Sequence, residues 1–264
     1  MFRLWPRLFS ILVCAGLLIV PVEGRCAGSL VLLDAAPAES TLAVGASLHA
    51  WPDSTNTGRS STRLWPAFDY YSHSGFFAST DDAVGWNLSR REAFQYGLRL
   101  WPQPGRDISR LPAGLDGFGT RIQPQAFANW QVWPALLLQS GYAYGAGRHH
   151  DGQQLELGAT TGFPVGEGGL VGIGIAANYA DRAFRNAYFG ITPQEAVRTQ
   201  LAARAIGSGW QDRSVLLSFE QKLGGHWRLD GQVLQSWLLG GAAESPLAQH
   251  RISHAATLSL WYEF

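Results

Sequence analysis

The feature that most constrains the fold of this chain is a period-two alternation of apolar and polar residues. In "AFQYGLRLW", Phe94, Tyr96 and Leu98 are apolar, while Gln95 and Arg99 lie between them. Side chains alternate between the two faces of a β-strand, so such segments predict strands with one apolar face. Strands in soluble proteins usually have about 5–6 residues, whereas a tilted strand crossing a bilayer has about 9–11. These segments have the membrane length.

The composition favours a wall that is not wholly exposed to water. Charged residues make up 15% of the chain, against about 25% in ordinary soluble domains. Aromatic residues reach 12%, and Lys222 is the only lysine. The 20 acidic and 20 basic residues balance, so the chain lacks the excess of positive charge that proteins use to bind nucleic acid. A secreted β-sandwich also alternates apolar and polar residues and is the soluble alternative.

We predict an all-β fold, a closed antiparallel transmembrane β-barrel of about 12 strands, with 10 as the alternative. A strand edge left unpaired in lipid would leave backbone N–H and C=O groups without partners, so the barrel must close. An even count also suits bacterial outer-membrane barrels. The predicted strands are 40–51, 61–73, 75–89, 92–102, 119–133, 135–147, 152–164, 168–181, 199–210, 212–223, 225–239 and 250–264.

The two longest connections conflict with this strand list. Outer-membrane barrels have short periplasmic turns and longer external loops. Segments 103–118 and 182–198 follow even-numbered predicted strands, which assigns them to the periplasmic side. We therefore expect the count to be off by one pair, or these segments to fold inward or serve the periplasmic side. Their turn formers and aromatic residues favour packed segments, either in the lumen or facing a periplasmic protein.

The N-terminus predicts export. Arg3 and Arg7 precede the apolar run "SILVCAGLLIVPV", which has the length of a signal-peptide core and is too short to span a bilayer. We expect residues 1–24 to be a cleaved signal peptide, with cleavage after residue 27 as the alternative. Residues 28–264 then form one outer-membrane barrel domain. At most Cys26 survives cleavage, so no internal disulfide is expected, and its fate stays open.

The chain finishes on a strand pattern, "ATLSLWYEF". We expect Leu258, Leu260, Tyr262 and Phe264 to face lipid and to form the signal that the bacterial barrel-assembly machinery reads. Aromatic rings placed near strand ends suit the two headgroup levels of a bilayer. The residues that we assign to these girdles are Trp51, Trp101, Tyr179, Trp227, Trp237, Tyr262 and Phe264.

Two polar motifs are candidates for chemistry. His149, His150 and Asp151 in "GRHHDG" include metal-ligand types, but adjacent histidines point in different directions, so a turn is favoured over a metal site. Ser253 and His254 are neighbours on one strand, face opposite sides and cannot form a nucleophile–base pair with each other. We predict no enzyme activity, no metal and no cofactor.

Four charged residues on two consecutive predicted strands should face the lumen. They are Glu220, Lys222, Arg228 and Asp230. They could tune a pore, but mutual neutralisation across the hairpin is favoured. A lumen of 12 strands is tight, whereas water-filled porins use 16–18 strands. A general diffusion pore is therefore not expected, although a narrow channel stays open as an alternative.

The segment "NAYFGITPQEA", followed by "GGAAESPLAQH" and a closing "YEF", resembles the MipA/OmpV family of outer-membrane proteins. The matching positions include Tyr188, Phe189, Gly190, Ser245 and Pro246, which are candidate partner contacts. "LPAGLDGF" after residue 110 resembles the same family's loop after an early strand. The likeness spans most of the chain and is strongest over residues 180–264.

This resemblance implies an outer-membrane scaffold in a Gram-negative bacterium, not an enzyme. Such a scaffold brings murein synthases and a lytic transglycosylase together, so those proteins are the expected partners, besides outer-membrane lipid and the assembly machinery. A narrow porin-like transport or adhesion barrel is the alternative function.

Overall fold

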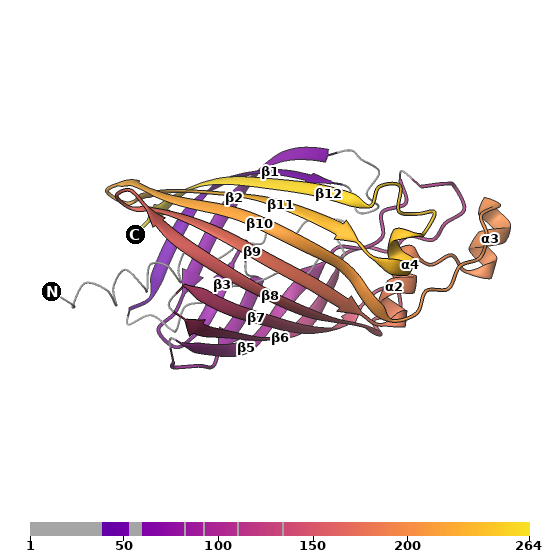
Figure 1. Ribbon diagram of the computed structural model, residues 1–264, viewed down its shortest axis with the longest axis horizontal. Helices are drawn as coiled ribbons and strands as arrows, with labels where there is room; N and C mark the ends of the chain where they lie inside the picture. Colours follow the sequence, from indigo (N-terminus) through magenta and orange to yellow (C-terminus); the bar gives the residue numbers. More distant parts are fainter. Residues whose placement is uncertain (1–38, 53–59, 82, 92, 110, 134) are drawn as a thin grey trace.

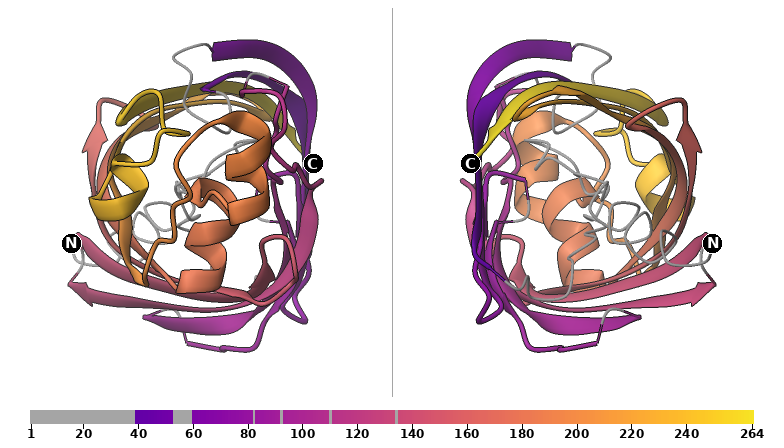
Figure 2. Two further views of the ribbon diagram at one scale, coloured as in Figure 1. Left: turned by 90° about the vertical axis from the view of Figure 1, so that its right-hand side faces the viewer. Right: turned by 90° about the vertical axis from the view of Figure 1, so that its left-hand side faces the viewer.

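The computed structural model describes residues 39–264 apart from 53–59, 82, 92, 110 and 134. Twelve described strands close into one barrel in which each strand runs antiparallel to both neighbours, and β1 pairs with β12 (Figures 1 and 2). The predicted fold is therefore confirmed. The predicted signal peptide and Cys26 lie outside the described residues. The strands are β1 (Thr41–Pro52), β2 (Ser60–Tyr71), β3 (Phe76–Ser79), β4 (Ala83–Asn87), β5 (Phe94–Gln103), β6 (Arg121–Trp133), β7 (Leu136–Ala146), β8 (Gly152–Val165), β9 (Gly169–Ala180), β10 (Gly209–Gly224), β11 (Trp227–Leu238) and β12 (Ile252–Glu263).

Three short helices stand between strands: α2 (Arg182–Phe189), α3 (Pro193–Thr199) and α4 (Gly240–Ala243). The carboxylate of Asp181 caps α2 by accepting a hydrogen bond from the Phe184 N–H at 2.8 Å. Thr192 and Glu195 form a reciprocal capping box at the start of α3. In the part of the chain that the structure describes, no helix is long and apolar enough to cross a membrane.

Two predicted strands are wrong, and their errors cancel in the count. Segment 75–89 is a hairpin of β3 and β4, because the polar run Thr80–Asp81 turns the chain and Ala83 adopts φ 64°. Segments 199–210 and 212–223 are instead an irregular stretch and one strand, β10. Most of 199–210 lies before β10, which begins at Gly209, and a bulge at Trp210/Asp212 shifts the register of β10 against β9.

The first correction, the β3–β4 hairpin, reverses the predicted sidedness of the long segments. Since successive strands alternate in direction, segments 104–120, 147–151, 181–208 and 239–251 all lie at one end of the barrel, here called the cap end (Figure 1). Thr41, Phe264 and the short turns lie at the opposite end, here called the terminal end. Short turns are periplasmic in outer-membrane barrels, so we expect the terminal end to face the periplasm. Segments 103–118 and 182–198 follow odd-numbered strands, β5 and β9, so the predicted strand list no longer assigns them to the periplasmic side.

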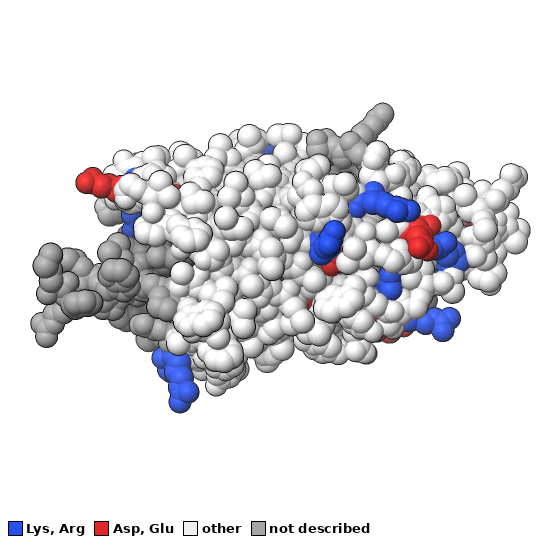
Figure 3. All heavy atoms as spheres, in the orientation of Figure 1, with Lys and Arg blue, Asp and Glu red and all other residues white. Residues whose placement is uncertain are grey.

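The wall has an apolar outside and a polar inside, as the alternation predicts. In β5, Leu98 is 59% exposed on the outer face, whereas its neighbour Arg99 is 3% exposed and points inward. Figure 3 shows a broad band of the wall almost without charged side chains, with charges gathered toward the two ends. That band suits the hydrocarbon core of a membrane.

The predicted aromatic girdles need correction at two positions. Trp51 and Trp101 are only 6% and 5% exposed, and Trp101 stacks under the guanidinium of Arg99 inside the barrel. Both rings therefore fill the lumen and do not reach lipid. Exposed aromatic rings nevertheless lie near both ends of the strands. They include Phe94, Trp133, Phe163, Trp227 and Phe264 toward the terminal end, and Tyr142, Tyr144, Tyr179 and Trp210 toward the cap end.

The wall is lowest at β3 and β4, which have only four and five residues. Among described residues, β2 pairs with β3 at Asp69–Tyr71, while its outer part pairs with β1 alone. The start of β2 reads Ser60, Ser61, Thr62, Arg63, a polar run. Polar residues are expected where a strand leaves the hydrocarbon and water can satisfy the backbone.

Candidate functional site

The cap end of the barrel carries an ordered structure rather than loose loops. Segments 104–120, 181–208 and 239–251, with helices α2, α3 and α4, lie across the barrel mouth, here together called the cap (Figure 2). α2 contacts the start of β8, and α3 lies farthest from the strands (Figure 1). The turn before β8 passes close to α2: Gly147 has φ +83°, and a Cβ there would lie 3.0 Å from Ala187. Only glycine suits that turn.

The cap has a hydrophobic core of its own. One buried cluster joins the cap to the strand ends; it consists of Ala146, Ala180, Phe184, Tyr188, Phe189, Ile206 and Ala242. A second cluster joins the cap segments to one another and consists of Leu111, Leu115, Ile191 and Leu247. Because apolar burial stabilises packed structure, the cap is held as a folded unit on the barrel.

Glu195 of α3 is the polar centre of the cap. Its Oε1 accepts hydrogen bonds from the Asp116 N–H at 3.0 Å and from Nη2 of Arg148 at 3.1 Å, and lies 3.4 Å from Nη1 of Arg106. Its Oε2 accepts from the Thr192 N–H at 2.8 Å. The side chains of Glu195 and Arg106 are almost fully buried. One carboxylate thus ties together α3, segment 104–120 and the turn before β8.

The surroundings of Glu195 stabilise its charged form. Burial alone would raise the pKa of the Glu195 carboxyl, but hydrogen bonds from the Thr192 and Asp116 N–H groups and from Arg148 outweigh it. The pKa falls from 4.5 to about 2. Asp116 shifts the same way, because a bidentate hydrogen bond from Arg198 lowers its pKa.

The residues of the family-like segment come together inside the cap. The Tyr188 hydroxyl donates to the Pro104 carbonyl at 2.6 Å, and the Ser245 hydroxyl donates to the Phe189 carbonyl at 2.7 Å. Tyr188, Phe189 and Ser245 are buried, as is Gly190, whereas Pro246 is exposed. In this structure the segment joins parts of the cap to one another, and only Pro246 of these five residues is open to a partner.

The lumen charges pair near the terminal end. Nε of Arg228 lies 3.2 Å from Oδ2 of Asp230, and its Nη1 donates to Oε1 of Glu263 at 2.9 Å. Glu220 is buried, as predicted, whereas Lys222 is exposed. Of the four predicted lumen charges, Lys222 therefore lies outside the cluster, and Glu263 joins it.

The terminal strand lies as predicted on the outer face. Leu258, Leu260 and Phe264 are exposed there, and Tyr262 is half-buried against Phe264 and Trp227. The Phe264 N–H donates to the Leu42 carbonyl at 3.0 Å, which extends the closing β1–β12 pair to the last residue. Recognition by the assembly machinery stays a prediction.

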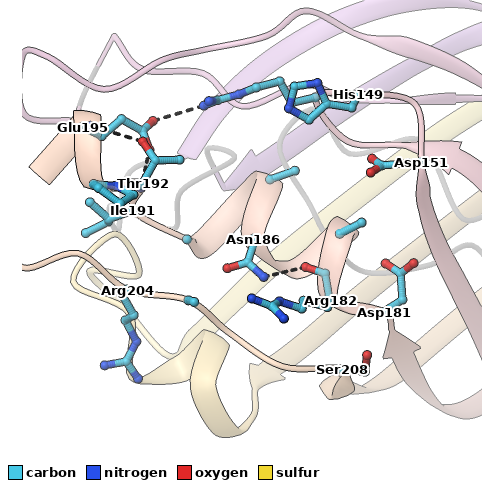
Figure 4. Close-up of a pocket in the computed structure, with 16 residues that line it drawn as sticks. His149, Asp151, Asp181, Arg182, Asn186, Ile191, Thr192, Glu195, Arg204 and Ser208 are labelled. Atoms are coloured by element: carbon cyan, nitrogen blue, oxygen red, sulfur yellow. Dashed lines mark hydrogen bonds and ion pairs between the residues drawn. The ribbon is translucent and has the colours of Figure 1, made fainter.

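An open pocket of about 700 Å³ lies on the outer side of the cap. It is bordered by the turn before β8, the start of α2, the start of α3 and the stretch before β10; Figure 4 labels ten of its residues. His149 and Asp151 of the "GRHHDG" motif line it, whereas His150 does not. Among described residues, no three His, Cys, Asp or Glu side chains gather as a metal site requires.

The two side chains of the second polar motif, Ser253 and His254, lie on opposite faces of the barrel wall. Ser253 is buried on the lumen face of β12, and His254 is exposed on the outer face. Their opposite orientation agrees with the period of a strand.

Sequence reasoning missed Glu195 and its arginine partners. One available signal was "TPQE" at residues 192–195, a capping box with proline in the first helical turn. That signal predicts a helix, α3, where an irregular segment was expected. The partners Arg106 and Arg148 are 89 and 47 positions away in the sequence, and no local pattern connects them to Glu195.

Replacing Glu195 with glutamine should loosen the cap. Removing one partner of a buried ion pair leaves Arg106 uncompensated and costs about 3–5 kcal/mol. The matched control is Glu244→Gln, which removes an exposed ion pair to Arg204 at 3.0 Å and should cost less than about 1 kcal/mol. Hydrogen exchange of α3 amides in the detergent-solubilised barrel measures both costs. Equal protection of the two variants would contradict the central role of Glu195.

The cap should also lose stability in acid. Because the pKa of Glu195 is lower in the folded cap, its contribution is complete above about pH 4.5 and declines as pH falls toward about 2. The protection factors of the α3 amides, which are corrected for the pH dependence of intrinsic exchange, should therefore fall over this interval and stay constant between pH 5 and 7. Asp116 acts in the same direction, so Glu195→Gln should flatten the pH dependence without removing it. An unchanged pH dependence in that variant would show that other groups are responsible.

Comparison with solved structures finds barrels with little sequence likeness. The CymD monoaromatic hydrocarbon channel is 9% identical, with 93% of this chain and 97% of that chain covered and a TM-score of 0.43. The NanC porin is 8% identical, with 85% and 100% covered and a TM-score of 0.40. The Pseudomonas putida toluene transporter TodX is 8% identical, with 92% and 96% covered and a TM-score of 0.38. Nothing about transport by this chain follows from such likenesses.

Comparison of the sequence itself is more specific. No curated protein matches the chain. The family model described as "MltA-interacting protein MipA" matches residues 44–264, a range that includes all twelve strands except the first residues of β1, together with the whole cap. This chain is therefore an outer-membrane β-barrel that belongs to the MipA family.

Proposed function

We propose that this barrel is a non-enzymatic scaffold that holds murein-processing proteins at the outer membrane. The observation that carries the proposal is a lumen filled by its own side chains. Trp261, Gln123 and Glu156, which come from three strands around the barrel, are each at most 2% exposed. A filled lumen under a folded cap offers no wide path for solutes, so the two ends are the surfaces left for function.

The terminal end is the surface that a periplasmic partner would reach. Its short turns expose polar and charged side chains, among them His73, Arg90, Arg91, Glu167 and His226. The description of the matching family names interaction with MltA, a lytic transglycosylase. Murein-processing enzymes work on the periplasmic side of the membrane, which favours docking at this end rather than on the cap. The role that this leaves for the family-like residues is to hold the cap together; they are Tyr188, Phe189, Gly190, Ser245 and Pro246.

The scaffold has a direct capture test. Purified barrel in detergent is passed over an immobilised lytic transglycosylase, and retained barrel is quantified. Replacing Arg90 and Arg91 with glutamate should lower capture at least about fivefold if their charges face the partner, since each fivefold change is about 1 kcal/mol. The matched control is Arg182→Glu, the same change at the cap end, which should leave capture unchanged.

Two results would contradict the proposal. One is loss of capture in Arg182→Glu with full capture in the terminal-end variant, which would place the partner on the cap. The other is steady conductance of the unmodified barrel in a planar bilayer, which would show an open lumen and favour the narrow-channel alternative.

A further inference from the structure

The outer pocket of the cap has features that a scaffold at the opposite end does not use. Its volume of about 700 Å³ is within the range of about 300–1,000 Å³ that small-molecule sites occupy. Its walls are held by contacts within the protein. The side chain of Asn186 donates to the Ile206 carbonyl at 2.6 Å and accepts from the Ile206 N–H at 2.8 Å. Phe184, in the first turn of α2, is fully buried.

Most of the charged groups around the pocket already have partners. Arg148 is paired with Glu195, and Arg204 donates to Oε2 of Glu244 at 3.0 Å. Asp181 uses one carboxylate oxygen to cap α2. These groups therefore hold the pocket in shape and have little capacity left for a ligand.

Two groups of opposite charge remain. The side chains of Asp151 and Arg182 are exposed and make no hydrogen bond or ion pair with any described residue. Figure 4 shows Asp151, from the turn before β8, apart from Arg182, which lies at the start of α2. The pocket thus has one free acidic side and one free basic side. A ligand with a single charge would meet attraction at one side and repulsion at the other, whereas a zwitterion meets attraction at both.

We propose that this pocket binds a short zwitterionic peptide from the external medium. Its ammonium group lies against Asp151, and its carboxylate accepts hydrogen bonds from the guanidinium of Arg182. The peptide bonds between the two charged ends supply donors and acceptors for His149 and Ser208, which also line the pocket. Neither charged contact is deeply buried, so binding is weak and reversible.

The test titrates trialanine into the full-length barrel in detergent, with binding followed by saturation-transfer NMR on the peptide methyl groups. N-acetyl-trialanine lacks the cation, trialanine amide lacks the anion, and free alanine has both charges closer together. Trialanine should bind most tightly, and each blocked peptide should bind about three- to tenfold more weakly. Asp151→Asn should weaken the binding of trialanine by a similar factor and leave the binding of N-acetyl-trialanine unchanged. The variant and the acetyl group each remove the same contact, the one between the peptide ammonium group and Asp151.

Arg182→Gln should remove the contact of the peptide carboxylate. It should therefore weaken the binding of trialanine and leave the binding of trialanine amide unchanged. The charge-exchange variant with Asp151→Arg and Arg182→Asp together should regain binding, since a zwitterion can bind in the reversed direction. Arg251→Gln, an exposed arginine outside the pocket, is the matched control and should change nothing. Four results would each overturn the proposal. Two concern the charges: equal binding of trialanine and both blocked peptides, or binding that the pocket variants do not change. The other two are tighter binding of an uncharged sugar such as maltotriose, and no binding of trialanine at 10 mM, which is on the order of the weakest useful affinities. Free alanine binding as tightly as trialanine would overturn the peptide assignment.

Discussion

A β-strand in hydrocarbon has no water to satisfy its backbone, and this fold depends on that constraint. The closing contact is the antiparallel pairing of β1 with β12, which runs from Ala43–Glu263 to Ala50–Ala256. A further hydrogen bond, from the Phe264 N–H to the Leu42 carbonyl, carries the pairing to the end of the chain. With this pair formed, alternate side chains must point either into lipid or into the lumen. The apolar exterior and the filled interior both follow from closure.

A second constraint is that polar groups buried in the narrow lumen and in the cap need hydrogen-bond or ion-pair partners. Inward side chains of the wall pair with one another, as Asn178 does when its amide donates to Oδ1 of Asp212 at 2.8 Å. At the mouth, Glu195 gathers two arginines and two backbone amides around one carboxylate. A buried charge of this kind is tolerated only when its partners are fixed. The cap is consequently a folded element, and contacts within the protein hold the walls of its outer pocket.

The sequence predicted the parts of the fold that follow from local periodicity. Strict alternation in β5, β9 and β12 fixed both the strand and the face, and Leu98, Arg99 and Leu258 lie where the pattern placed them. It failed where turn chemistry interrupts the pattern, as at Thr80–Asp81, and where an irregular stretch, 199–208, was predicted as a strand. The first of these errors, which counted the hairpin of β3 and β4 as one strand, also reversed the predicted sidedness of the long segments.

The cap could not be predicted in the same way. Its contacts join residues far apart in the chain, such as Tyr188 with Pro104 and Ser245 with Phe189. The composition of the cap segments shows that they are rich in aromatic residues. It does not show which surfaces those residues pack against. The family-like residues drew attention to this region correctly, and their burial explains why the segment is constrained. A partner-binding role for them rests on no contact in the structure.

The account depends most on orientation, with the cap outside the cell and the terminal end in the periplasm. Val197 on α3 is 84% exposed, and His226 is exposed in a turn at the terminal end. Each is replaced with cysteine in a chain whose Cys14 and Cys26 are changed to serine, and intact cells are treated with a membrane-impermeant maleimide. We predict labelling of Val197→Cys in intact cells and of His226→Cys only after the outer membrane is permeabilised. The opposite pattern would contradict the account, since the cap would then face the periplasm and the docking surface would lie outside.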